Sequence, residues 1–132
     1  MARNALEIMA DARTIALVGA SPRPERPSNS VMRYLLDEGY RVIPVRPVGP
    51  PEIHGQRRVA SLAEIEEPID LVDVFRRSEA CPGVAEEAVA VRAGALWLQL
   101  GVVSAEARKI AEEAGLDYVE DECTAIVHRQ LA

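Results

Sequence analysis

The residues of this chain that are best suited to chemistry are a short glycine turn and a set of arginines. The turn, Gly19-Ala20-Ser21-Pro22, follows the apolar run Thr14–Val18. Main-chain N–H groups at such a turn, together with the N-terminus of a following helix, favour a bound anion. We therefore predict a phosphate contact at Gly19, and we expect a side chain at position 19 to occupy the space of the phosphate.

The basic residues gather in three places, although the chain as a whole is acidic, with a net charge of −6. These places are Arg23 with Arg26, Arg46, and Arg76 with Arg77. A guanidinium presents paired N–H donors that match phosphate oxygens better than a lysine does. The clustering therefore indicates binding of a ligand that carries several phosphates.

Composition excludes several classes of function. The net negative charge argues against general nucleic-acid binding. No apolar run approaches the roughly 20 residues that cross a membrane, and no signal sequence is recognisable at the start, so we expect a cytoplasmic protein. Cys81 and Cys123 form neither a disulfide framework nor a metal-ligand spacing.

The elements that must position these residues alternate between helix and strand. Strands are expected at 14–18, 40–45, 69–75, 95–100 and 118–120, and helices at 4–10, 28–38, 78–93, 104–114 and 121–131. Ser28 or Asn29 is expected to cap the second helix, and Gly94 to close the third. A capping box at Ser61–Glu64 predicts a further single turn, and 54–59 a turn with a short extended piece.

Continuously apolar strands separated by helices are typical of a parallel sheet covered on both faces. We predict a single α/β domain over residues 1–132, a Rossmann-like doubly wound sheet of about five strands. Ligands of such sheets bind at the carboxyl ends of the strands. All three arginine groups follow predicted strands and should meet there. Asp73 lies near the end of the third strand, with no evident carboxylate partner for acid–base work.

Arg46, at the end of the second strand, discriminates between ligands. NAD-binding proteins usually carry an acid at this point, whereas an arginine suits a ribose phosphate, as in NADP or the 3′-phosphate of coenzyme A. The fingerprint G-x-G-x-x-G is absent, which disfavours NADP.

Several segments resemble the stand-alone bacterial CoA-binding proteins, a family related to the N-terminal CoA-binding domain of the succinyl-CoA synthetase α subunit. The matching segments are 15–22, 26–28, 35–45, 73–77, 97–101 and 121–129. Glu122 departs from the family, whose members often carry a basic residue there. The phosphohistidine domain of the synthetase has no counterpart in this chain.

The resemblance implies that CoA lies across the strand ends. Gly19, Ala20 and Ser21 would then meet the phosphates, and Gln99, Leu100 and Gly101 would lie near the pantetheine arm. Arg26, on the loop after the glycine turn, is a candidate ligand contact because of the arginine clustering and not because of the resemblance. The adenosine end would be lined by Val45, Arg46 and Pro47, and Phe75, Arg76 and Arg77 would flank the adenine and pyrophosphate.

We therefore expect a CoA- or acyl-CoA-binding protein, and no catalytic constellation is evident. Two alternatives stay open. One is an NADP- or nucleotide-dependent enzyme. The other is a module that senses acyl-CoA and acts through a homodimer or another protein, which an exposed apolar patch would favour.

Overall fold

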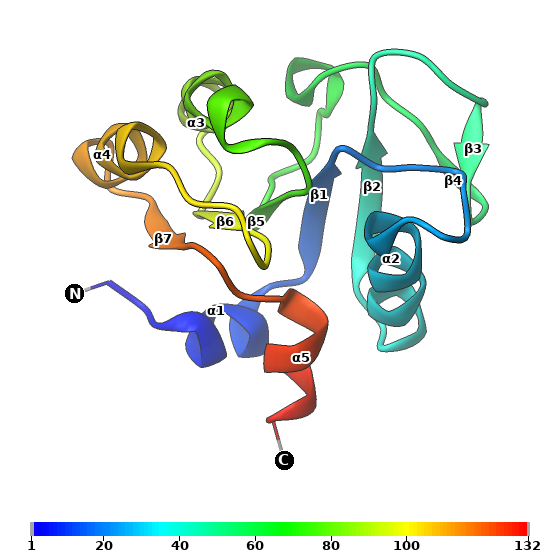
Figure 1. Cartoon of the computed structure of the whole chain (residues 1–132), viewed down its shortest axis with the longest axis horizontal. Helices are drawn as coiled ribbons and strands as arrows, with labels where there is room; N and C mark the ends of the chain where they lie inside the picture. The colour runs from blue at the N-terminus through cyan, green and yellow to red at the C-terminus, as the bar shows by residue number, and fades with distance from the viewer. Residues whose placement is uncertain (1, 132) are drawn as a thin grey trace.

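The computed structural model describes residues 2–131 and contains a five-stranded sheet (Figure 1). Its strands are β1 (Thr14–Val18), β2 (Arg41–Val45), β5 (Leu71–Val74), β6 (Ala95–Leu98) and β7 (Asp117–Val119). They are all parallel and lie in the order β2-β1-β5-β6-β7. A separate hairpin pairs β3 (Glu52–Ile53) with β4 (Gln56–Arg57). The predicted Rossmann-like fold is confirmed.

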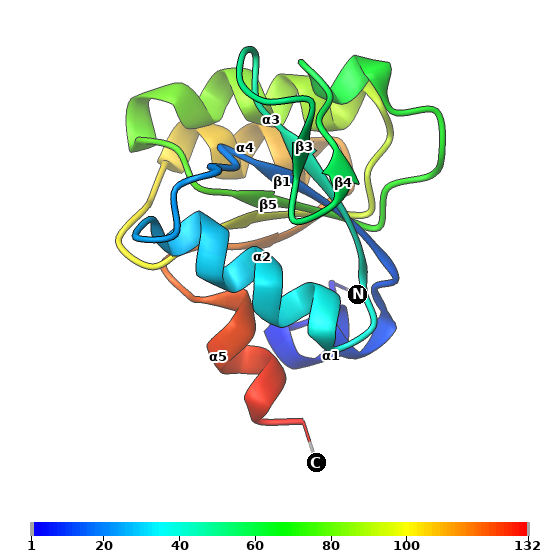
Figure 2. The ribbon, with the colours of Figure 1, turned by 90° about the vertical axis from the view of Figure 1, so that its right-hand side faces the viewer.

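Helices cover both faces of the sheet, as Figure 2 shows. One face carries α1 (Ala5–Asp11), α2 (Pro27–Asp37) and α5 (Thr124–Arg129), and the other carries α3 (Cys81–Ala90) and α4 (Ala105–Glu113). Two short 3₁₀ turns, η1 (Leu62–Glu64) and η2 (Ser78–Ala80), complete the chain. Within residues 2–131, no helix combines the length and the apolar character that crossing a membrane requires.

Each face of the sheet has its own buried core, because successive side chains of a strand point to opposite sides. In β1, Ile15 and Leu17 pack on the side of α1, α2 and α5. Ala16 and Val18 pack on the side of α3 and α4. This double burial explains why the strands are apolar at nearly every position.

The order in which strands are added to the sheet reverses at β1, because β2 lies on one side of β1 and β5 lies on the other. From β1 the chain passes through α2 to β2, and it then returns to the other side of β1 to form β5. The turn after β1 and the segment after β5 therefore face each other at the carboxyl edge. Such a switch point is where open α/β sheets bind their ligands.

Several predicted boundaries are wrong. Helix α2 begins at Pro27, and neither Ser28 nor Asn29 caps it, because both lie buried within its first turn. Ser61 precedes η1 without a side-chain capping bond; Glu64 instead accepts a hydrogen bond from the N–H of Ala60 at 3.2 Å.

The helix predicted over 78–93 is a 3₁₀ turn followed by α3, which ends at Ala90. Arg92, with φ of 58°, adopts the left-handed conformation after the helix. Gly94 does not end the helix. It allows two backbone segments to lie close together, since a Cβ there would lie 2.8 Å from the carbonyl oxygen of Asp70. The strands predicted over 69–75 and 95–100 end earlier, at Val74 and Leu98, although the N–H groups of Phe75 and Gln99 still donate to the carbonyls of Val18 and Val74.

Candidate ligand-binding site

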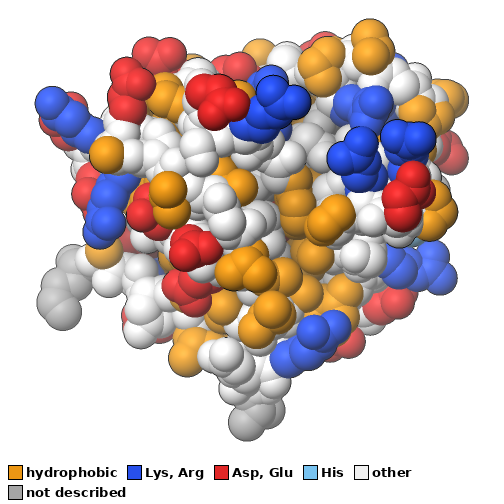
Figure 3. Space-filling view, viewed as in Figure 1, with side chains coloured by type: hydrophobic (Ala, Val, Ile, Leu, Met, Phe, Trp, Pro, Cys, Tyr) orange, Lys and Arg blue, Asp and Glu red, His pale blue; other side chains and the backbone are white. Residues whose placement is uncertain are grey.

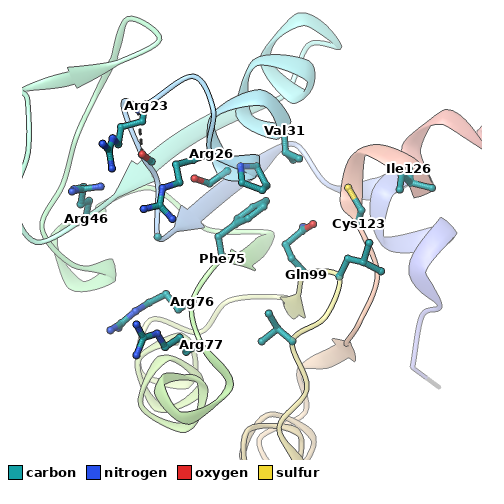
Figure 4. Close-up of a pocket in the computed structure, with 16 residues that line it drawn as sticks. Arg23, Arg26, Val31, Arg46, Phe75, Arg76, Arg77, Gln99, Cys123 and Ile126 are labelled. Atoms are coloured by element: carbon teal, nitrogen blue, oxygen red, sulfur yellow. Dashed lines mark hydrogen bonds between the residues drawn. The ribbon is translucent and has the colours of Figure 1, made fainter.

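A pocket of about 660 Å³ lies at the carboxyl edge of the sheet (Figure 4). Its walls come from the ends of β1, β2, β5 and β6 and from the starts of α2 and α5. It is lined by Gly19, Ser21, Arg23, Arg26, Pro27, Ser28, Val31, Arg46, Phe75, Arg76, Arg77, Gln99, Leu100, Val102, Cys123 and Ile126.

Gly19 is required by a close approach of two backbones rather than by the space of a phosphate. Its φ is +88°, and a Cβ there would lie 2.6 Å from the carbonyl oxygen of Phe75. A side chain would thus push the turn after β1 away from the segment after β5. The expectation that it would enter the phosphate space is wrong, although the conclusion that only glycine fits here holds.

The glycine turn directs its first N–H groups away from the pocket. Those of Gly19 and Ala20 point to the carbonyl oxygen of Val45, at 3.1 and 3.4 Å. The amide of Asn29 donates to the carbonyl of Ser21 at 2.8 Å and fixes the turn against α2. Ser28, in the first turn of α2, lines the pocket. The positive N-terminal end of the α2 dipole therefore faces the pocket.

Arg46 is held in place by the main chain. Its Nε donates to the carbonyl of Val48 at 2.7 Å, and its Nη1 donates to the carbonyl of Ala20 at 3.2 Å. Arg58 in turn binds the carbonyls of Arg46 and Pro50, at 2.7 and 2.9 Å, and so fixes the loop after β2. A guanidinium has more N–H donors than these two bonds use, so Arg46 keeps donors for a ligand.

The other arginines of the pocket are exposed. Within residues 2–131, the side chains of Arg26, Arg76 and Arg77 form neither an ion pair nor a hydrogen bond, and Arg23 meets only the exposed Glu25 at 3.4 Å. Figure 4 shows Arg23, Arg26 and Arg46 on one side of the pocket, with Arg76 and Arg77 together on another. Positive charge is therefore concentrated at one end.

A buried polar group lies beneath the middle of the pocket. Gln99 donates from Nε2 to Asp73, and to the hydroxyl of Thr124 at 3.0 Å, while that hydroxyl donates to Asp73 at 3.0 Å. Burial raises the pKa of Asp73 to about 7, although the hydrogen bonds from Gln99 and Thr124 oppose the shift. Asp73 thus has the partners that were not evident in the sequence, an amide and a hydroxyl rather than a carboxylate.

The opposite end of the pocket is apolar. Val31, Leu100 and Ile126 line it together with Cys123, and none of these side chains is charged. Figure 3 shows one group of Lys and Arg side chains at the upper right of this face, with others at its edges, and apolar side chains in its centre and lower part. The pocket therefore suits a ligand that is anionic at one end and apolar at the other.

Most of the predicted site residues meet in this pocket: Gly19, Ser21, Arg26, Arg46, Phe75, Arg76, Arg77, Gln99 and Leu100. Four others do not line it. Ala20 and Val45 are buried behind the turn, and Pro47 and Gly101 lie on the loops beyond.

Six further lining residues were not predicted from the sequence: Pro27, Ser28, Val31, Val102, Cys123 and Ile126. Pro27 and Ser28 stand four and three residues before Val31 on the helix after the glycine turn, so all three lie on one side of that helix. This spacing could have indicated that they line the pocket together. No local signal places α5 beside the strand ends.

A doubly wound parallel sheet with a pocket at its switch point is the architecture of the Rossmann-like α/β domains. Residues 13–129 match the model of the CoA binding domain family, and the chain belongs to this family. The resemblance noted in the sequence is thereby confirmed, and CoA is the ligand class that the family indicates.

Two similar proteins match nearly the whole of this chain. The uncharacterized protein YneT of Bacillus subtilis (strain 168) is 44% identical over 122 residues, which cover 92% of this chain and 90% of YneT. A hypothetical protein from Pyrococcus horikoshii OT3 superposes with a TM-score of 0.92 at 39% identity, covering 96% of this chain and 89% of that one.

A more distant structure shares the fold. It is the dinucleotide-forming acetyl-coenzyme A synthetase 1 of Ca. Korarchaeum cryptofilum, with a TM-score of 0.76 at 20% identity. The similarity covers 88% of this chain and 28% of that enzyme. This chain therefore has the fold of one part of a much larger protein.

Proposed function

We propose that this protein binds coenzyme A in the pocket at the carboxyl edge of its sheet. The ADP-3′-phosphate part would lie at the arginine end, and the pantetheine arm would run past Gln99 toward α5. The observation that carries the proposal is the gathering of five arginines, Arg23, Arg26, Arg46, Arg76 and Arg77, around one pocket of a protein whose net charge is −6.

The different polarity of the two ends of the pocket supports this orientation. A ligand with phosphates alone would leave the apolar end empty, and an apolar ligand would leave the arginines without partners. CoA has the required sequence of groups: phosphates, then an arm with amide groups, then a thiol. In this arrangement Arg46 contacts the 3′-phosphate, because it follows β2, where the adenosine ribose lies in related folds.

We propose binding without catalysis. The pocket is lined by arginines, a few uncharged polar residues, a cysteine and apolar side chains, and its lining contains neither a histidine nor a carboxylate. Asp73 lies under the floor, already bonded to Gln99 and Thr124. Among the described lining residues, the Cys123 thiol is the one titrating group besides the arginines, and no histidine, carboxylate or lysine of the lining can act with it as an acid–base pair.

Isothermal titration calorimetry tests the proposal, on protein from which any ligand carried over from expression has been removed. The titrants are CoA, dephospho-CoA, NADP and ATP. We expect CoA to bind, and dephospho-CoA to bind more weakly. Binding of NADP in preference to CoA would contradict the proposal and favour a nucleotide-dependent enzyme, and failure of CoA to bind would refute it.

A substitution of Arg46 tests the contact with the 3′-phosphate. Hydrogen bonds to charged groups contribute about 1.5–3 kcal/mol, so Arg46→Ala should weaken CoA binding about 10- to 100-fold and dephospho-CoA binding much less. Arg57→Ala, which removes the same charge from the exposed strand β4, is the matched control. Equal losses for the two ligands would rule out this contact.

A further inference from the structure

The apolar end of the pocket has more uncovered apolar surface than a bare thiol would use. Leu100 is 66% exposed and Ile126 is 49% exposed, and both line the pocket. Large apolar side chains this open to water, gathered beside a ligand pocket, indicate a surface that a further group covers. Both belong to the end farthest from the arginines.

Gln99 indicates the path by which a ligand reaches that end. Its side chain is only 5% exposed and lines the pocket. The Asp73 carboxylate and the Thr124 hydroxyl hold its Nε2, which directs its Oε1 the other way. Oε1 has no partner, and every buried side-chain N or O atom of the described residues is paired, so this oxygen opens to the pocket. Figure 4 shows it on the side of Val31 and Cys123.

An acceptor fixed in this way suits the N–H of an amide. The pantetheine arm of CoA carries amides between its phosphates and its sulfur, so a bond to Gln99 would direct the sulfur toward Cys123, Leu100 and Ile126. Any group attached to that sulfur would then lie on the exposed apolar surface.

From these observations, and resting on the proposed function, we infer that the preferred ligand is an acyl-CoA whose acyl chain is aliphatic and uncharged, seated on Leu100 and Ile126. The charge of this end selects against an acidic acyl group. Its lining residues carry no cation, and Glu122 precedes Cys123. A terminal carboxylate there would lose water without gaining a partner.

Calorimetric titration with free CoA and with acetyl-, butanoyl-, hexanoyl- and succinyl-CoA tests the inference. A fully covered methylene changes affinity about fourfold. Because this surface is open on one side, we expect hexanoyl-CoA to bind about tenfold more tightly than acetyl-CoA. Butanoyl- and succinyl-CoA form a matched pair, with chains of equal length that differ in a methyl and a carboxylate, and we expect butanoyl-CoA to bind more tightly.

Two variants test where the acyl chain of the ligand lies. Ile126→Ser should remove most of the gain of hexanoyl-CoA over acetyl-CoA, and because Ile126 also lines the pocket it should lower the affinity for free CoA by a much smaller factor. Val103→Ser is the matched control, because Val103 is also 49% exposed but does not line the pocket. Leu100→Ser, in a loop outside any helix, gives the same test if Ile126→Ser fails to fold.

The possible outcomes separate the two proposals. If CoA binds and hexanoyl-CoA binds no more tightly, or if succinyl-CoA binds more tightly than butanoyl-CoA, the acyl inference is overturned and CoA binding stands. If none of these ligands binds, the proposed function is refuted, and the acyl inference is refuted with it.

Discussion

Replacement of Asp73 by asparagine should make the protein less sensitive to pH. Asp73 is completely buried, and its neighbours in the sheet are Leu17 in β1 and Trp97 in β6. Burial raises its pKa from 3.8 to about 7. The folded state therefore holds the proton more tightly than the unfolded state, and ionisation opposes folding.

The sign and size of the effect follow from this shift. The stabilising contribution is complete below about pH 4 and is lost as the pH rises to about 7, with a total of about 4 kcal/mol. Asp73→Asn keeps the shape of the side chain and cannot ionise. From pH 5 to pH 8, wild type should therefore lose about 3 kcal/mol of unfolding free energy relative to the variant.

Urea unfolding of both proteins at several values between pH 5 and pH 8 measures this difference. The other titrating groups are common to the two chains, so their contributions cancel. A difference between wild type and Asp73→Asn that stays constant over this range would refute the argument, because Asp73 would then have the same pKa in the folded and unfolded states.

Two further predictions concern local backbone geometry, and urea unfolding measures both. Gly19→Ala should destabilise the protein by about 2 kcal/mol more than Gly115→Ala, since both glycines have a positive φ but only at Gly19 would a Cβ meet the carbonyl of Phe75; equal losses would contradict the close approach. Ser104→Ala should cost about 1 kcal/mol, because Ser104 caps α4 by accepting a bond from Ala107 at 3.1 Å. Ser61→Ala, which removes no capping bond, should cost much less, and a loss as large would contradict this assignment.

The sequence predicted the sheet and the gathering of arginines because both depend on simple physical constraints. Strands buried on two faces must be apolar throughout, and parallel strands bring their carboxyl ends to one edge. That edge is where Arg46, Arg76 and Arg77 follow their strands. The same constraint placed Gln99 near the pocket.

Other features depend on contacts between distant residues and could not be predicted. Asn29 looked like a helix cap, but its side chain binds the turn at Ser21. Asp73 and Thr124 are far apart in the sequence, so their bond to each other and to Gln99 follows only from the position of α5. The cytoplasmic location and a homodimer or protein partner stay predictions.

The arginines of the pocket differ in how firmly their side chains are held, and this difference affects the rates of binding. Arg26, Arg76 and Arg77 are unrestrained within the described residues, so their field should draw in an anionic ligand and accelerate association, an effect that salt screens. Arg46 is already immobilised by two carbonyls, so a ligand that meets it loses little side-chain entropy. Loss of an unrestrained arginine should thus slow the arrival of the ligand, whereas loss of Arg46 should shorten its residence time.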